Sequence, residues 1–166
     1  CLTALSDLEV EHEEARGSLY YLNYGNGVTI ATTRPETIFA DVAVAVNPTD
    51  ERFKHLIGQT CKIPLANREI PIIGDEAVLT DFGTGALKIT PAHDPTDFEI
   101  GQRHNLEQLV CLTETGRLNE LTGEFNGLDR FKARATVTEK LEAEGLLVKT
   151  EGHLNKVGHC YRCHTV

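Results

Sequence analysis

Two acidic residues three positions apart, Asp94 and Asp97, stand where a helix is expected to begin in the stretch HDPTDFE. Asp94 is suited to cap the helix, Pro95 to occupy its first position and Asp97 to lie in its first turn. A helix N-terminus favours an ionised carboxylate, so we expect Asp97 to stay anionic and able to bind a substrate ammonium group. Capping alone also explains both residues, and the two interpretations are compatible.

Lys88 and Thr90 alternate with apolar residues in the preceding stretch, GTGALKIT. Residues two apart in a strand share a face, so the ammonium and hydroxyl groups would point the same way and could line a pocket. Taken alone, the pattern favours a solvent-facing side. The glycines make a turn or allow a close backbone approach, and their spacing is not that of a phosphate loop or a dinucleotide-binding motif.

The segment ATTRPET ends a predicted strand at the start of a short helix, where unpaired N–H groups and hydroxyls point outward. Such a place suits a carbonyl, a ribose hydroxyl or an anion. Thr33 and Glu36 have the spacing of a capping box, so this segment by itself favours Thr33 as a cap and Arg34 as a surface charge.

No signature of a covalent nucleophile accompanies these residues. The chain has no GxSxG motif, and no cysteine stands in an electropositive setting that the sequence identifies. Any hydrolysis is therefore expected to use water positioned by polar groups.

The composition is that of one intracellular domain. The 166 residues are 40% hydrophobic and 25% charged, and no apolar run approaches the roughly 18 residues of a membrane span. Five cysteines without framework spacing indicate a reducing compartment, and the absence of Met indicates a piece of a longer protein. The net charge of −9 argues against a grip along a nucleic-acid backbone; an RNA substrate would be contacted only at its tip.

We predict an α+β fold with a β-barrel-like core and peripheral α-helices. Residues 1–16 are expected to connect to the parent protein, 17–158 to form the domain and 159–166 to lead back. A hairpin is expected from Leu19 to Thr33 around Gly25-Asn26-Gly27. Further strands are expected within residues 41–46, 61–65, 68–73, 76–79, 85–90, 146–149 and 153–157. Helices are expected within residues 50–56, 94–104 and 129–144, the last with Phe131, Ala135 and Leu141 as its apolar stripe.

A metal site is the remaining possibility near the end of the chain. Cys160 and Cys163 have the CxxC spacing that forms half of a zinc site, with His159 and His164 beside them. Four ligands within six residues rarely close a tetrahedron, so we expect no metal or cofactor here unless further ligands lie beyond Val166. His93 suits a structural role as well as acid–base work.

ATTRPETIFADVAVAV followed by IPIIGDEAVLTDFGTGALKITPAHDPTDFEIGQRH closely resembles the editing domain inserted into class I aminoacyl-tRNA synthetases. The resemblance covers nearly the whole chain, from TALSDLEVE to VGHCYRC. Glu36 and Lys88 make it most similar to the domain of the valyl enzymes. Isoleucyl enzymes have a Trp-containing first motif and His in place of Lys88, and leucyl enzymes tend toward TTRPDT.

The resemblance implies hydrolysis of the ester of misacylated Thr-tRNA(Val) after transfer, by a positioned water. In the family's pattern, Asp97 binds the α-ammonium group, Asp94 is our choice to sense the side-chain hydroxyl, and Lys88 and Thr90 lie near the ester. The implied catalytic residues are Lys88, Thr90, Asp94 and Asp97, and the implied substrate-binding residues are Thr32, Thr33, Arg34, Phe82, Asp94 and Asp97.

The implied partners are the aminoacylated 3′ end of the tRNA and the rest of the parent synthetase, in a cytoplasmic monomer that makes no membrane contact. Two alternatives stay open. The domain could edit for an isoleucyl or leucyl enzyme, or it could be a non-catalytic insertion that binds the tRNA 3′ end.

Overall fold

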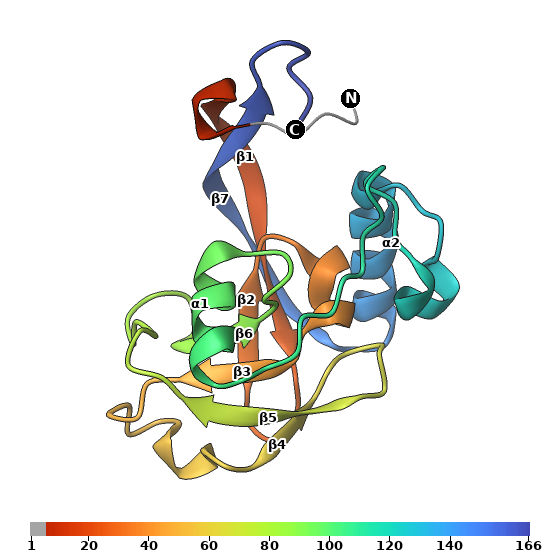
Figure 1. The fold of residues 1–166 in the computed structure, drawn as a ribbon. Helices are drawn as coiled ribbons and strands as arrows, with labels where there is room; N and C mark the ends of the chain where they lie inside the picture. Colours follow the sequence, from red (N-terminus) through yellow and green to blue (C-terminus); the bar gives the residue numbers. More distant parts are fainter. Residues whose placement is uncertain (1–5) are drawn as a thin grey trace.

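A long two-stranded ribbon is the most extended feature of the computed structural model, which describes residues 6–166 (Figure 1). Strands β1 (Val10–Asn23) and β7 (Leu147–Cys160) pair antiparallel along their length, and β2 (Thr29–Thr32) lies on the other edge of β1. A single 3-10 turn, η1 (Asp7–Glu9), precedes β1. The expected connecting segment lies outside the described residues at positions 1–5, whereas residues 10–16 belong to β1.

The predicted hairpin between β1 and β2 is confirmed. Its register runs from Tyr20 opposite Thr32 to Asn23 opposite Thr29. The turn residues Gly25, Asn26 and Gly27 all have positive φ (73°, 50° and 75°), a conformation that glycine adopts freely and asparagine tolerates. This turn sets the register that brings Thr32 to the end of β2.

The second sheet has four short strands in the order β4 (Thr60–Lys62), β5 (Glu69–Gly74), β3 (Ala43–Val46) and β6 (Ala86–Ile89). Strand β3 pairs parallel with β5 and antiparallel with β6, and all four of its residues are buried. The described residues thus form a mixed α+β domain with two sheets, and the prediction of a β-barrel-like core is wrong because the sheets do not close. The strand expected at residues 76–79 is also wrong, since those residues form turns.

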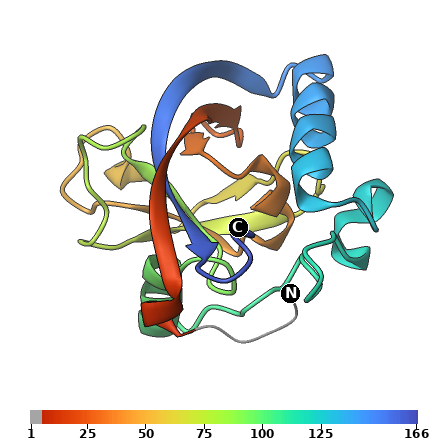
Figure 2. The same ribbon diagram turned by 90° about the horizontal axis from the view of Figure 1, so that it is seen from above.

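Two α-helices and three further 3-10 segments lie around the sheets (Figures 1 and 2). They are η2 (Pro35–Ala40), η3 (Lys54–Leu56), α1 (Pro95–Arg103), η4 (Glu120–Phe125) and α2 (Arg130–Ala143). Both α-helices match their predictions, and Asp94 and Asp129 cap them. None of the helices in the described part of the chain has the length and apolar composition of a membrane span.

The apolar stripe predicted for α2 is wrong in part. Ala133, Val137 and Leu141 are the buried residues of the helix, whereas Phe131 and Ala135 are exposed. The buried positions repeat every four residues and face the core, so the packed face is rotated from the one that Phe131 suggested. An outward-facing phenylalanine therefore stands at the start of the helix.

The predicted capping box at Thr33 and Glu36 is also wrong. Segment η2 begins after Arg34 with no side-chain cap. The buried Glu36 carboxylate instead accepts hydrogen bonds from Arg134 Nε at 2.9 Å and Arg134 Nη2 at 2.6 Å. This ion pair joins η2 to α2 across 98 positions of sequence.

Replacing Arg134 with Met is expected to lower the free energy of unfolding by about 3–5 kcal/mol, because the Glu36 carboxylate would stay buried without its partner. Urea denaturation of the chain measures this change. The double variant Glu36→Leu/Arg134→Met should recover most of the loss, since it removes both charges. A double variant as unstable as Arg134→Met would show that the ion pair does not cause the effect.

Candidate active site

A cavity of about 410 Å³ is lined by every residue that the sequence predicts to bind the substrate or to take part in catalysis. Strands β1, β2, β6 and β7, together with the starts of η2 and α1, contribute to it. The eight predicted residues in its lining are Thr32, Thr33, Arg34, Phe82, Lys88, Thr90, Asp94 and Asp97. The other lining residues are Leu19, Ala31, Thr37, Leu87, His93, Thr96, His153 and Asn155. The structure thus brings the predicted residues together, while their individual roles stay predictions.

The Gly83-Thr84-Gly85 motif forms the turn that leads into β6. Gly83 and Gly85 have positive φ (59° and 82°), and the Gly85 N–H donates to the Phe82 carbonyl at 3.0 Å. A Cβ on Gly85 would also lie 3.1 Å from the Thr80 carbonyl oxygen. The turn therefore requires glycine, and it leaves the Phe82 ring exposed at the cavity.

The junction between β6 and α1 fixes the two aspartates. Asp94 Oδ1 accepts hydrogen bonds from the N–H groups of Thr96 at 2.9 Å and Asp97 at 3.3 Å. The Oδ2 atom of Asp97 accepts one from the Thr90 N–H at 2.9 Å. Among the described residues, the second oxygen of each carboxylate accepts no hydrogen bond. Backbone donors thus orient both aspartates and leave one oxygen of each for a ligand.

A buried carboxylate that the sequence reasoning missed, Asp41, holds Lys88 and Thr90. Its side chain is fully buried, and its Oδ1 accepts from Thr90 Oγ1 at 2.6 Å and from Lys88 Nζ at 3.2 Å. Its Oδ2 accepts from the Tyr24 hydroxyl at 2.6 Å. The signal was an acidic residue directly before an apolar buried strand, because a carboxylate in such a place must find partners.

Burial dominates the acid–base properties of this cluster. It raises the pKa of Asp41, although Lys88 and the hydroxyls of Thr90 and Tyr24 oppose the shift. Burial also raises the pKa of Asp97 to about 6, with Lys88 and the Thr90 N–H opposing it. Asp97 is therefore mainly ionised at pH 7, as the sequence predicted, but by a narrow margin. Burial outweighs the stabilisation that the helix N-terminus provides.

His93 is a partly buried residue of the cavity lining. Burial lowers its pKa, and the charges of Lys88 and Arg34 act in the same direction. Its Nε2 accepts the Cys111 N–H at 3.1 Å, which assigns the proton of the neutral ring to Nδ1. Of the two roles that the sequence left open for His93, this hydrogen bond favours the structural one.

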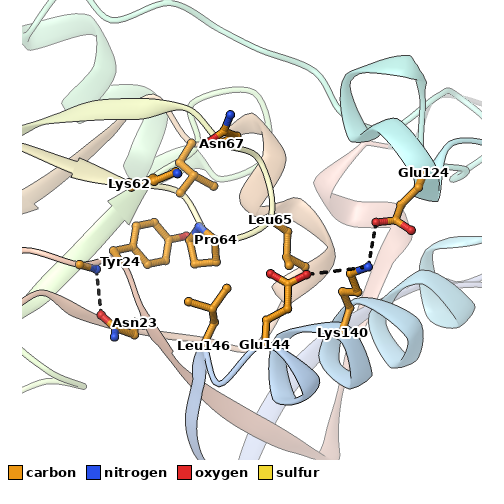
Figure 3. A pocket seen from close by; sticks show the side chains of 12 residues that line it. Asn23, Tyr24, Lys62, Pro64, Leu65, Asn67, Glu124, Lys140, Glu144 and Leu146 are labelled. Carbon is orange, nitrogen blue, oxygen red and sulfur yellow. Dashed lines mark hydrogen bonds and ion pairs between the residues drawn. The ribbon is translucent and has the colours of Figure 1, made fainter.

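A second cavity, also of about 410 Å³, lies near the C-terminal end of α2 and contains none of the predicted residues (Figure 3). Its lining contains two lysines, and one of them, Lys140, lies 3.4 Å from Glu124 and 3.8 Å from Glu144, so the charge of Lys140 is compensated. Tyr24, Pro64 and Leu146 supply an apolar part of its lining.

Metal binding by the CxxC pair, Cys160 and Cys163, stays a prediction. Within residues 6–166, no three His, Cys, Asp or Glu side chains are grouped so that they could hold a metal ion. Cys160 is buried at the end of β7, and the Cys163 thiol lies 3.3 Å from the Thr165 hydroxyl.

Comparison with known proteins places this chain in a family. The family model described as "Leucyl-tRNA synthetase, editing domain" matches residues 48–142, more than half of the chain. The chain belongs to the editing-domain family of the aminoacyl-tRNA synthetases. Its fold resembles that of LeuRS in a ternary complex with tRNA and LeuAMS from Agrobacterium radiobacter, with a TM-score of 0.60 and 17% identity over 93% of this chain and 24% of that one.

Curated relatives of this editing domain are valine–tRNA ligases. The chain is 56% identical to the ligase of Carboxydothermus hydrogenoformans over 171 residues, which cover 100% of this chain and 20% of that protein. It is 52% identical to that of Clostridium tetani, covering 100% and 19%. It is 53% identical to that of Aquifex aeolicus, covering 99% and 16%. The chain therefore spans about a fifth or less of the length of these relatives.

The raised pKa of Asp97 predicts a measurable pH dependence of stability. The folded state retains the proton up to about pH 6, whereas the unfolded state loses it near pH 4, so the wild type should lose stability as the pH rises between these values. Relative to Asp97→Asn, the loss should reach up to about 3 kcal/mol and stay constant above pH 7. Urea denaturation of both proteins from pH 4 to pH 8 measures it, and a pH-independent difference would refute the shift.

Proposed function

We propose that this domain hydrolyses the threonyl ester of misacylated Thr-tRNA(Val) as the post-transfer editing domain of a valyl-tRNA synthetase. The observation that carries the proposal is the convergence of Asp94, Asp97 and Lys88 on one cavity in a chain of the editing-domain family. The similarity to valine–tRNA ligases over the whole chain supports valine rather than leucine or isoleucine as the cognate amino acid.

The two carboxylates each recognise a different group of the threonine. The unbonded oxygen of the buried Asp97 accepts from the α-ammonium group, and the ammonium charge offsets the cost of ionising Asp97. The unbonded oxygen of Asp94 accepts from the threonine hydroxyl. Valine has a methyl group in place of this hydroxyl, so it would leave Asp94 without its donor. Valyl-tRNA synthetases are themselves the standard example of why a second pocket is needed, because an apolar synthetic site rejects threonine only about 10²-fold.

Lys88 and Thr90 act at the ester. The Lys88 ammonium group stabilises the negative charge that develops on the carbonyl oxygen as water adds to the carbonyl carbon. The bond to the ribose oxygen then breaks, and that oxygen takes up a proton equivalent to the one that the attacking water loses, which yields threonine and a tRNA with a free terminal hydroxyl. No Ser or Cys belongs to the described lining of this cavity, which supports a positioned water rather than a covalent intermediate.

The terminal adenosine lies toward the open side of the cavity in this proposal. Arg34 and Phe82 are exposed there, and Thr32 and Thr33 supply hydroxyls at the end of β2. In the proposed complex these residues contact the ribose and base, while the amino acid occupies the deeper part beside Asp97.

Replacing Asp97 with Ala is expected to reduce deacylation of Thr-tRNA(Val) by at least about 100-fold, because the variant cannot form the charged hydrogen bond to the ammonium group. The measurement is single-turnover hydrolysis of Thr-tRNA(Val) and Val-tRNA(Val) by the synthetase that contains the domain. Glu99→Ala, which removes an exposed carboxylate from the same helix, is the matched control. Clearance of the threonyl ester at the wild-type rate would refute the assignment, and binding without hydrolysis by the wild type would favour a non-catalytic insertion.

Replacing Lys88 with Ala is expected to slow the chemical step by about 10²- to 10³-fold, the usual effect of removing one group that stabilises an oxyanion. Single-turnover cleavage at saturating enzyme separates this effect from weaker binding. Lys62→Ala, at an exposed lysine outside the cavity, should leave the rate unchanged. Undiminished cleavage by the Lys88 variant would remove this residue from the mechanism.

A further inference from the structure

A short segment between β5 and β6, residues 79–85, carries Phe82 to the edge of the candidate active site. We call it the tip segment, and it consists of turns and bends. Two of its apolar residues, Leu79 and Phe82, are each 65% exposed, so neither side chain is packed into the core. The position of Phe82 at the cavity must therefore be fixed by contacts of another kind.

Packing beneath the tip segment is incomplete. A cavity of about 190 Å³ is lined both by the tip segment and by residues of β1, β2 and β6, namely Leu19, Ala31, Ala86 and Leu87. Void space beside apolar side chains forfeits dispersion contacts, so it holds its surroundings less firmly than close packing does. Among the described residues, no backbone hydrogen bond joins the tip segment to a neighbouring strand or helix.

The topology of the second sheet brings another segment, residues 47–52, beside these turns. Val46 is the last residue of β3, and it pairs with Gly74 at the end of β5 and with Ala86 at the start of β6. The chain therefore leaves β3 at the same edge at which it leaves β5 and enters β6. Side chains of residues 47–52 can reach the tip segment from there.

Two of these side chains bind the backbone of the turns. Asn47 Nδ2 donates to the Val78 carbonyl at 2.9 Å, and Val78 is itself buried, so the turns are anchored as far as this residue. Beyond it, Arg52 Nη2 donates to the Thr80 carbonyl at 2.6 Å. The Arg52 guanidinium also lies so close to Gly85 that a Cβ on this glycine would collide with it. Arg52 thus contacts the tip segment near both of its ends.

Asp50 orients the Arg52 guanidinium. The Asp50 side chain is 5% exposed, and it accepts hydrogen bonds from Arg52 Nε at 3.0 Å and from Arg52 Nη2 at 2.6 Å. Two charge-assisted bonds of this kind fix the direction of the guanidinium as well as its place. Hydrogen bonding to Arg52 also lowers the pKa of Asp50, so the carboxylate stays charged at neutral pH.

We propose that Arg52 is a positioning residue of the candidate active site, because it holds the tip segment where Phe82 borders the cavity. The proposal rests on the proposed function, in which Phe82 contacts the terminal adenosine. Arg52 is not among the described lining residues of the cavity, so it acts on the substrate through the Thr80 carbonyl and the tip segment. A ring that is already in place binds without the entropic cost of ordering it.

The first test observes the tip segment without substrate. The chain contains no Trp, so Phe82→Trp introduces a single indole whose fluorescence anisotropy reports local motion. Adding Arg52→Met should increase the anisotropy lost to nanosecond motion by about 2-fold or more. Asp50→Asn, which removes only the charge that orients Arg52, is a milder variant and should cause a smaller increase. Lys54→Met removes an exposed cation just outside residues 47–52 and should change nothing.

The second test measures hydrolysis of Thr-tRNA(Val) by the synthetase that contains the domain. Arg52→Met should raise KM by about 5-fold and leave kcat unchanged, because a contact with the nucleoside contributes equally to the ground state and the transition state. Phe82→Ala should have a similar effect. The double variant should have a KM no higher than that of the weaker-binding single variant, since both changes remove the same contact. A general loss of stability would instead add to the effect of Phe82→Ala.

Four outcomes would overturn the proposal: an unchanged anisotropy decay in folded Arg52→Met, an unchanged KM, additive effects of Arg52→Met and Phe82→Ala, or an equal effect of Lys54→Met. If the wild type does not hydrolyse the ester, the proposed function fails separately. The anisotropy measurement needs no substrate, so it still decides whether Arg52 holds the tip segment.

Discussion

The Asp41 carboxylate is completely removed from water, and its two oxygens are satisfied by groups from separate parts of the chain. Tyr24, the residue after the hairpin strand β1, donates one hydrogen bond, and Lys88 and Thr90 donate from β6 and the residue after it. A buried carboxylate without such partners would be strongly destabilising, so the packing of these elements and the hydrogen bonds depend on each other. Because Lys88 and Thr90 also line the cavity, the interaction that stabilises the core fixes two polar groups of the cavity lining.

Asp94 and Asp97 both fit a helix-capping pattern in the sequence, but they differ in how deeply they are buried. Asp94 is exposed and caps α1, whereas Asp97 is 5% exposed and its pKa is raised to about 6. A carboxylate that is only narrowly ionised at neutral pH gains most from a cationic ligand, because the ligand removes the unfavourable energy of the buried charge. The folded protein therefore carries an unfavourable buried charge that a cation bound beside Asp97 would relieve.

Local signals predicted most of the elements, and long-range contacts decided what was missed. The turn at residues 25–27, the cap of α1 at Asp94 and that of α2 at Asp129 depend on atoms a few residues apart, so their types and spacing sufficed. Whether the sheets close, and which residue pairs with Glu36, depends on residues far along the chain. The position of Glu36 matched a local capping pattern. In the structure its carboxylate instead accepts two charge-assisted hydrogen bonds from Arg134, which are stronger than a capping hydrogen bond.

The site shows the same division between local pattern and three-dimensional arrangement. Lys88, Thr90, Asp94 and Asp97 lie within ten consecutive positions, so spacing and the family resemblance singled them out, whereas Asn155 reaches the cavity only because β7 pairs with β1. The net charge of a chain likewise does not show where on the surface its charges lie. An excess of acidic residues excludes an extended grip on RNA, but exposed charges act over a screening length of about 8 Å, so a local cluster can still bind phosphates.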